Sequence, residues 1–173
     1  CYFSTDAVFD GMQSQKPYGE DDATNPVSVY GKSKLRGEKA VLSASPNNVV
    51  VRITLAYAAL YARRKDPARI ILESLKQGNP VGGITDQYIT PAFVPTIARA
   101  LNKIIIAEAR GVYHLGSTDH CTNYEFAKKI ANRFGYDENL VFPITLQEFS
   151  KQRVAHRAFY AWLGTNKFQT EFG

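Results

Sequence analysis

Apolar residues along this chain fall into two patterns, short continuous runs and longer stretches with helical spacing. The clearest run is Val49–Ile53, which is rich in β-branched residues and typical of a parallel strand buried on both faces. A shorter β-prone stretch covers residues 1–5. Between the two, apolar positions from Tyr30 to Val41 recur at helical spacing. Residues 1–53 therefore predict a strand, a helix and a strand, which is one unit of a parallel α/β sheet.

Start and stop signals bound the predicted helices. Asn25 and Pro26 predict the start of the first helix, because Asn can cap a helix and Pro is tolerated at its first position. The remaining predicted elements are helices over 67–77, 95–107 and 122–134 and a strand over 111–115, with residues 79–83 forming a turn into a short extended piece. Thr122 or Asn123 is expected to cap the last of these helices, and Gly135 to end it.

Composition and charge narrow the class of protein. The 173 residues are 45% hydrophobic and 21% charged, as in a globular domain, and no stretch approaches the roughly 20 apolar residues that span a bilayer. The two cysteines form neither a disulfide framework nor a zinc motif, so we expect a cytoplasmic protein without a metal. The net charge of +5 is scattered, which predicts no nucleic-acid partner. It fits a mildly basic protein, or one that attracts an anionic ligand such as a sugar diphosphate.

The start of the chain is unusual. It begins at Cys1 rather than at Met, and it opens directly on the first predicted strand. Because a strand needs neighbours on both edges or a reason to lack them, we expect further residues upstream.

Candidate chemistry lies on the first predicted helix. Tyr30 and Lys34 form a Y-x3-K pair, and side chains at this spacing share one helix face. A nearby ammonium favours the phenolate form of a tyrosine, which can then exchange a proton with a carbonyl or an alcohol. The chain contains two further matches to this pattern, Tyr61/Lys65 and Tyr124/Lys128.

Context selects Tyr30 among the three matches. Its helix follows a strand that ends in Ser4-Thr5-Asp6, and ligands of parallel sheets bind outside the carboxyl ends of the strands. We therefore predict that Thr5 and Tyr30 face one crevice. His114 lies within the strand predicted at 111–115 and is expected to be structural.

Two segments carry a family resemblance. Residues 4–11 (STDAVFDG) and 30–41 (YGKSKLRGEKAV), with matching residues between and after them, resemble the dTDP-4-dehydrorhamnose reductase family, the RmlD-like proteins. These are extended short-chain dehydrogenases/reductases that act on nucleotide sugars. The resemblance covers nearly the whole chain.

The resemblance implies a role for each matching residue. Thr5 would hydrogen-bond the sugar carbonyl, Tyr30 would donate the proton, and Lys34 would assist Tyr30 and bind the nicotinamide ribose together with it. The hydride would come from NADPH or NADH and reduce the C4 keto group of a nucleotide-linked deoxysugar. The residues expected near the substrate sugar are Asp6, Asp86 and Gln87.

The same resemblance implies the architecture. Residues 1–60 would be the C-terminal part of a Rossmann-type domain, and residues 61–173 a smaller, mostly helical substrate-binding subdomain, with interleaved elements. A homodimer is a possible assembly. The chain departs from the family in lacking a glycine-rich turn for the dinucleotide pyrophosphate, and in having Ala7 where a tyrosine is usual.

Two other functions stay open at this point. The first is a non-catalytic binding subunit on the same fold, because the regulatory β subunit of methionine adenosyltransferase also resembles this family. The second is a nucleotide-sugar epimerase or dehydratase, which needs further acid–base residues near Thr5. Asp6 is compatible with that reading, whereas Phe9-Asp10-Gly11 favours a reductase.

Overall fold

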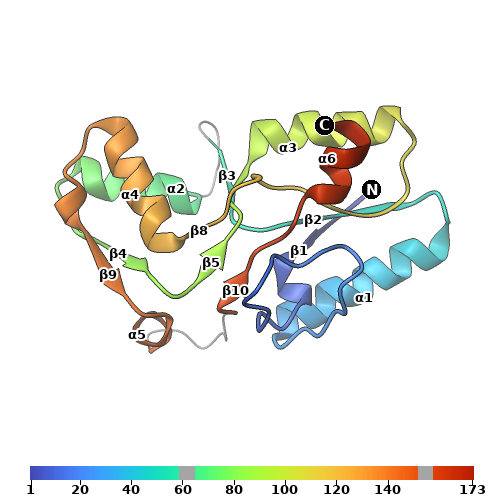
Figure 1. Ribbon diagram of the computed structural model, residues 1–173, viewed down its shortest axis with the longest axis horizontal. Coiled ribbons are helices and arrows are strands. Elements are labelled where there is room, and N and C mark those ends of the chain that lie inside the picture. Colours follow the sequence, from blue (N-terminus) through green and yellow to red (C-terminus); the bar gives the residue numbers. More distant parts are fainter. Residues whose placement is uncertain (59–64, 152–157) are drawn as a thin grey trace.

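A three-stranded parallel sheet organises the half of the molecule that contains both chain ends (Figure 1). The computed structural model describes residues 1–58, 65–151 and 158–173. The sheet has the order β1-β2-β7 and consists of β1 (Tyr2–Thr5), β2 (Val49–Ile53) and β7 (Gly111–His114). Its helices are α1 (Val29–Ala44), α3 (Val94–Ile106) and α6 (Asn166–Phe172).

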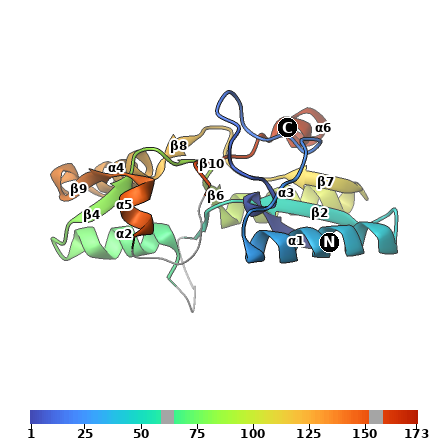
Figure 2. The same cartoon turned by 90° about the horizontal axis from the view of Figure 1, so that it is seen from below.

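The other half of the molecule is smaller and built around two helices and a strand pair. The helices are α2 (Pro67–Lys76) and α4 (Asn123–Phe134), and the parallel pair is β4 (Val81–Ile84) with β9 (Val141–Ile144). Short elements complete this half and join it to the sheet: η1 (Asp6–Val8), β3 (Ala56–Tyr57), β5 (Tyr88–Ile89), β6 (Ala92–Phe93), β8 (Cys121–Thr122), η2 (Glu138–Leu140), α5 (Leu146–Ser150) and β10 (Tyr160–Ala161). Figure 2 shows the two halves side by side.

The observed elements confirm the predicted α/β class and most of the predicted segments. The chain passes between the halves more than once, since α3, β7 and α6 all follow residue 60 yet lie with the sheet. The predicted boundary between a Rossmann-type part (residues 1–60) and a substrate-binding subdomain (residues 61–173) therefore stays a prediction. No helix in the described ranges is long and apolar enough to cross a membrane.

The start of α1 differs from the prediction. The helix begins at Val29, and Ser28 caps it by accepting a hydrogen bond from the Gly31 backbone N–H at 3.0 Å. Asn25 lies three residues before this cap, and its side-chain amide instead donates to Asp10, at 3.3 Å. By contrast, Thr122 caps α4 in a full capping box with Glu125.

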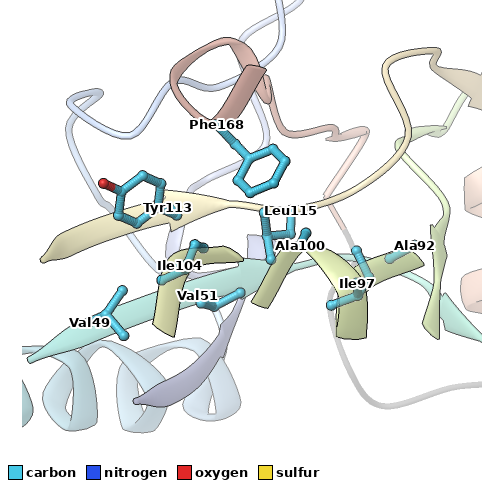
Figure 3. Packing of buried hydrophobic residues seen from close by; sticks show 9 residues of the cluster. All are labelled: Val49, Val51, Ala92, Ile97, Ala100, Ile104, Tyr113, Leu115 and Phe168. Carbon is cyan, nitrogen blue, oxygen red and sulfur yellow. The ribbon is translucent and has the colours of Figure 1, made fainter. Parts of the chain in front are cut away.

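One face of the sheet is covered by an apolar cluster (Figure 3). Val49 and Val51 of β2 pack with α3, and Tyr113 of β7 packs in the same cluster with Phe168 of α6. The buried members of this cluster are Val49, Val51, Ala92, Ile97, Ala100, Ile104, Tyr113, Leu115 and Phe168. Because side chains alternate along a strand, Arg52 must point to the opposite face, toward α1.

The opposite face holds a buried ion pair. Arg52 donates from Nε to one oxygen of Glu38 at 2.9 Å and from Nη2 to the other at 2.7 Å. These two parallel bonds make the pair bidentate. The pair is also desolvated, because Arg52 and Glu38 are only 4% and 2% exposed. It joins β2 to the middle of α1, and breaking it would leave one buried charge uncompensated.

His114 extends this network to β7 and confirms its expected structural role. Its Nδ1 lies 3.1 Å from the Tyr18 carbonyl and its Nε2 lies 3.3 Å from Arg52 Nη1. A carbonyl can only accept and a guanidinium can only donate, so the proton resides on Nδ1 and Nε2 accepts. Burial and the Arg52 guanidinium lower the pKa of His114 to about 3. Burial also raises the pKa of Glu20, which accepts from the His114 backbone N–H.

The network predicts loss of stability in acid. Between about pH 6.5 and pH 3 the unfolded chain binds a proton at His114 that the folded chain does not, so stability falls as the pH falls. Lowering the pH from 7.5 to 5 should cost about 2 kcal/mol of unfolding free energy through this residue. The raised pKa of Glu20 acts in the opposite direction. Urea unfolding at several pH values measures the combined effect of His114 and Glu20 on the unfolding free energy.

The His114→Asn variant isolates the histidine contribution, because Glu20 and its backbone partner remain in place. We expect a flatter dependence of stability on pH in this variant than in the wild type. His120→Asn is the matched control, since His120 is exposed. Equal pH slopes for wild type and His114→Asn would contradict the assignment.

Candidate functional site

A cavity of about 450 Å³ opens beyond the carboxyl ends of β1 and β2. Thr5 ends β1, and Thr54 and Leu55 directly follow β2, so the strands deliver these residues to the cavity. Among the described residues, those that line it are Thr5, Asp6, Ala7, Phe9, Val27, Ser28, Tyr30, Thr54, Leu55, Gln87, Ile89, Ala158 and Ala161. The location agrees with the rule that ligands of parallel sheets bind at this edge.

A close backbone contact brings Tyr30 to the cavity. A Cβ atom on Gly31 would lie only 2.0 Å from the Ala7 carbonyl oxygen, so only glycine lets α1 approach η1 this closely. Tyr30 comes immediately before Gly31, and its side chain is 59% exposed at the cavity rim. The predicted convergence of Thr5 and Tyr30 on one crevice is therefore observed.

The Thr5 hydroxyl is already hydrogen-bonded within the protein. Its Oγ1 donates to Asp6 Oδ1 at 2.9 Å and accepts from the Ala7 backbone N–H at 3.2 Å. The second bond makes Thr5 the cap of η1. Donation to a ligand would require the hydroxyl proton to turn away from Asp6.

Lys34 lies on the same helix as Tyr30 but does not line the cavity. Its ammonium donates to the Phe3 carbonyl at 2.5 Å and lies 4.3 Å from the centre of the Tyr2 ring. One turn of helix thus separates a tyrosine at the cavity from a lysine directed at β1. An ammonium has three donors, so two remain for other partners.

Of the three residues predicted near the sugar, Asp6 and Gln87 line the cavity and Asp86 does not. Gln87 lines the cavity, and its amide is held at both ends: Nε2 donates to the Ala158 carbonyl at 2.6 Å and Oε1 accepts from Asn123 at 2.9 Å. Asp86 is not among the cavity residues, and its Oδ1 accepts from the Leu146 backbone N–H at 2.6 Å, at the start of α5.

The structure thus gathers Thr5, Asp6, Tyr30 and Gln87 at one cavity, with Lys34 and Asp86 outside its lining. Sequence reasoning missed Thr54, which is 5% exposed. The available signal was its position, immediately after a buried strand that runs parallel to the one ending in Thr5.

The other Y-x3-K pairs do not compete for this role. Tyr124 and Lys128 lie on α4 in the smaller half, where the ammonium is 5.6 Å from the centre of the tyrosine ring. Tyr61 lies outside the described residues. In the ranges 1–58, 65–151 and 158–173, no group of three or more His, Cys, Asp or Glu side chains is placed to hold a metal ion.

A comparison with family models gives one match over the full length. The sequence model of the RmlD substrate binding domain matches residues 1–173. A dTDP-4-dehydrorhamnose reductase from Sinorhizobium fredii is 32% identical over 182 aligned positions, covering 99% of this chain and 60% of the relative. The methionine adenosyltransferase 2 subunit beta of Danio rerio is 31% identical over 152, covering 84% and 46%. The chain thus spans about half the length of these relatives.

Solved structures give a similar result. The dTDP-4-dehydrorhamnose reductase from Bacillus anthracis, in complex with NADP, superposes with a TM-score of 0.89 at 28% identity, covering 99% of this chain and 58% of that one. The reductase from Clostridium acetobutylicum gives 0.89 at 31% identity, with coverage of 99% and 59%. A dTDP-glucose 4,6-dehydratase from Streptomyces venezuelae, at 17% identity and a TM-score of 0.74, shares the fold; the alignment covers 99% of this chain and 53% of that one.

The contact at Gly31 yields a prediction about stability. Gly31→Ala should lower the unfolding free energy by about 2–4 kcal/mol, because the added methyl group meets a backbone carbonyl that cannot move aside. Gly37→Ala in the same helix is the matched control. Its methyl group would meet the hydroxyl and the adjoining ring carbons of Tyr2, a side chain that can turn aside as a backbone carbonyl cannot, and the gain of about 1 kcal/mol in helix propensity offsets part of that contact.

Chemical unfolding of both variants measures the difference. A Gly31→Ala variant as stable as Gly37→Ala would show that α1 and η1 do not depend on their close approach.

Proposed function

This chain belongs to the RmlD substrate binding domain family, and from that membership we propose that it holds the substrate and donates a proton in a reductase. The substrate is the 4-keto form of a nucleotide-linked deoxysugar, as in the conversion of dTDP-4-dehydrorhamnose to dTDP-rhamnose. The observation that carries the proposal is the cavity that Thr5 and Tyr30 share beyond the carboxyl ends of two parallel strands.

The reaction assigns one role to each of these groups. NADPH or NADH, when bound, supplies the hydride that reduces the keto carbon. Tyr30 donates its phenolic proton to the carbonyl oxygen, and its exposed position at the cavity rim leaves it accessible to a substrate. Asp6 and Gln87 lie in the same lining and are positioned to meet the sugar.

Lys34 assists from outside the cavity in this proposal. Its ammonium stabilises the phenolate that remains after proton transfer, because it lies one helical turn from Tyr30 on the same face. Its two uncommitted N–H donors suit the vicinal hydroxyls of a nicotinamide ribose, the part of the cofactor that Tyr30 and Lys34 would hold.

The composition of the cavity favours reduction over dehydration. Removing water from a sugar needs one group to abstract a proton from carbon and another to protonate the departing hydroxyl. Among the described residues, the lining contains one carboxylate, Asp6, and the next position is the methyl group of Ala7. Keto reduction needs a single proton donor, which Tyr30 provides.

A second candidate is a non-catalytic binding subunit on the same fold. The similarity to a methionine adenosyltransferase 2 subunit beta supports it, as does Lys34, whose ammonium contacts β1 rather than Tyr30. In that case the cavity would bind a ligand without turning it over. Measuring binding and turnover in the same preparation separates the two candidates.

Tyr30→Phe tests the reductase in the full-length natural protein that contains this sequence. Removing the proton donor should lower kcat by about 10²–10⁴-fold and leave the affinity for dTDP-rhamnose within a few-fold of wild type. The rate is followed as oxidation of NADPH with dTDP-4-dehydrorhamnose as the substrate.

Tyr124→Phe is the matched control, since it makes the same change within a Y-x3-K pair outside the cavity. It should keep the wild-type rate. Retention of full activity by Tyr30→Phe would refute its assignment as proton donor. A wild-type protein that binds dTDP-rhamnose without any turnover would favour the binding subunit.

A further inference from the structure

Thr54 occupies a special position beside Thr5. In the parallel pair of β1 and β2, Thr5 is in register with Ile53, so Thr54 lies one residue further toward the cavity on the neighbouring strand. Adjacent strands are about 4.8 Å apart, which brings the two threonines to the same mouth of the sheet. Both line the cavity with Tyr30.

The hydroxyl of Thr54 differs from the hydroxyl of Thr5 and the amide of Gln87 in this cavity. The residue is 5% exposed, and in the part of the chain that the structure describes its side chain makes no hydrogen bond. In contrast, Thr5 is bonded to Asp6 and to a backbone N–H, and both ends of the Gln87 amide are bonded. Because Thr54 lines the cavity, a hydroxyl without a protein partner at this position is available to a bound ligand.

The backbone around Thr54 is held in place. Leu55, the next residue, has a φ of +37°, a backbone conformation that residues other than glycine rarely adopt. Its carbonyl accepts a hydrogen bond from the Ala92 backbone N–H at 3.2 Å, which ties the segment after β2 to β6. The hydroxyl of Thr54 is thus presented from a fixed main chain.

We propose that Thr54 is a substrate-binding residue whose hydroxyl donates a hydrogen bond to an oxygen of the sugar in a nucleotide-sugar substrate. The proposal rests on the function proposed above. The cavity wall is mainly apolar and contains the carboxylate of Asp6, which can only accept hydrogen bonds. The Thr5 proton points to Asp6, whereas the Thr54 hydroxyl has no acceptor among the described residues and can donate to an oxygen-rich ligand.

The test compares Thr54→Val with Thr54→Ser in the full-length natural protein. Valine keeps the shape and removes the hydroxyl, and serine keeps the hydroxyl. Calorimetry with dTDP-rhamnose and, separately, with NADPH measures the two affinities. Thr54→Val should weaken dTDP-rhamnose binding by about 10- to 100-fold and leave NADPH binding unchanged. Thr54→Ser should stay within about threefold of wild type for both.

The test includes one control variant and one replacement variant. Thr170→Val changes an exposed threonine on α6 and should alter neither affinity. If Thr54→Val fails to fold by circular dichroism, Thr54→Ala removes the same hydroxyl without adding bulk and replaces it in the test.

Two results would overturn the proposal. Wild-type affinity of Thr54→Val for dTDP-rhamnose would show that the hydroxyl does not contact the sugar, and a loss confined to NADPH would assign it to the cofactor. The proposed reductase function is tested separately, by measuring turnover. A wild-type protein that binds dTDP-rhamnose without turnover rejects the reductase, while the binding constants still decide the role of Thr54.

Discussion

The buried bidentate pair between Arg52 and Glu38 is the interaction on which the geometry of this protein depends. It fixes the middle of α1 against β2, and His114 joins the pair to β7 with a single tautomer. Near its first turn the same helix is held by the approach of Gly31 to the Ala7 carbonyl. A helix fixed at two points can neither rotate nor slide. Tyr30, the residue before Gly31, is therefore held at the rim of the cavity.

The sequence predicted the elements well because their signals are local. A β-branched run becomes a buried strand, and a Thr with Glu three residues later caps a helix, whatever the rest of the chain does. The start of α1 was placed too early because two residue types compete for one task. Asn25 and Ser28 are both good caps by type, and the structure uses Ser28, while the Asn25 amide donates to Asp10, 15 residues earlier in the chain.

Side-chain partners set a second limit on sequence reasoning. The spacing of Tyr30 and Lys34 fixes the helix face that they share, but the end of a long lysine side chain goes to whatever acceptor lies within reach, here the carbonyl of Phe3. Asp86 is drawn away from the cavity in the same way by the unpaired N–H at the start of α5. For Thr54 the sequence offers only its position after a buried strand, and the hydrogen-bonding state of its hydroxyl is visible only in the structure.

These limits bear on how the cavity distributes its hydrogen-bonding capacity. Gln87 is held from both sides, and the Thr5 hydroxyl both accepts and donates within the protein, so these groups shape the wall before any ligand arrives. Wall groups that are already satisfied lose little freedom on binding, which lowers the entropic cost of holding a ligand. Among the described residues, the cavity groups with an uncommitted hydroxyl proton include Tyr30 at the exposed rim and Thr54, a residue that is 5% exposed. A phenol near solvent suits proton exchange and a hydroxyl on a fixed main chain suits recognition, and the two groups come from different elements: Tyr30 from helix α1 and Thr54 from the end of β2.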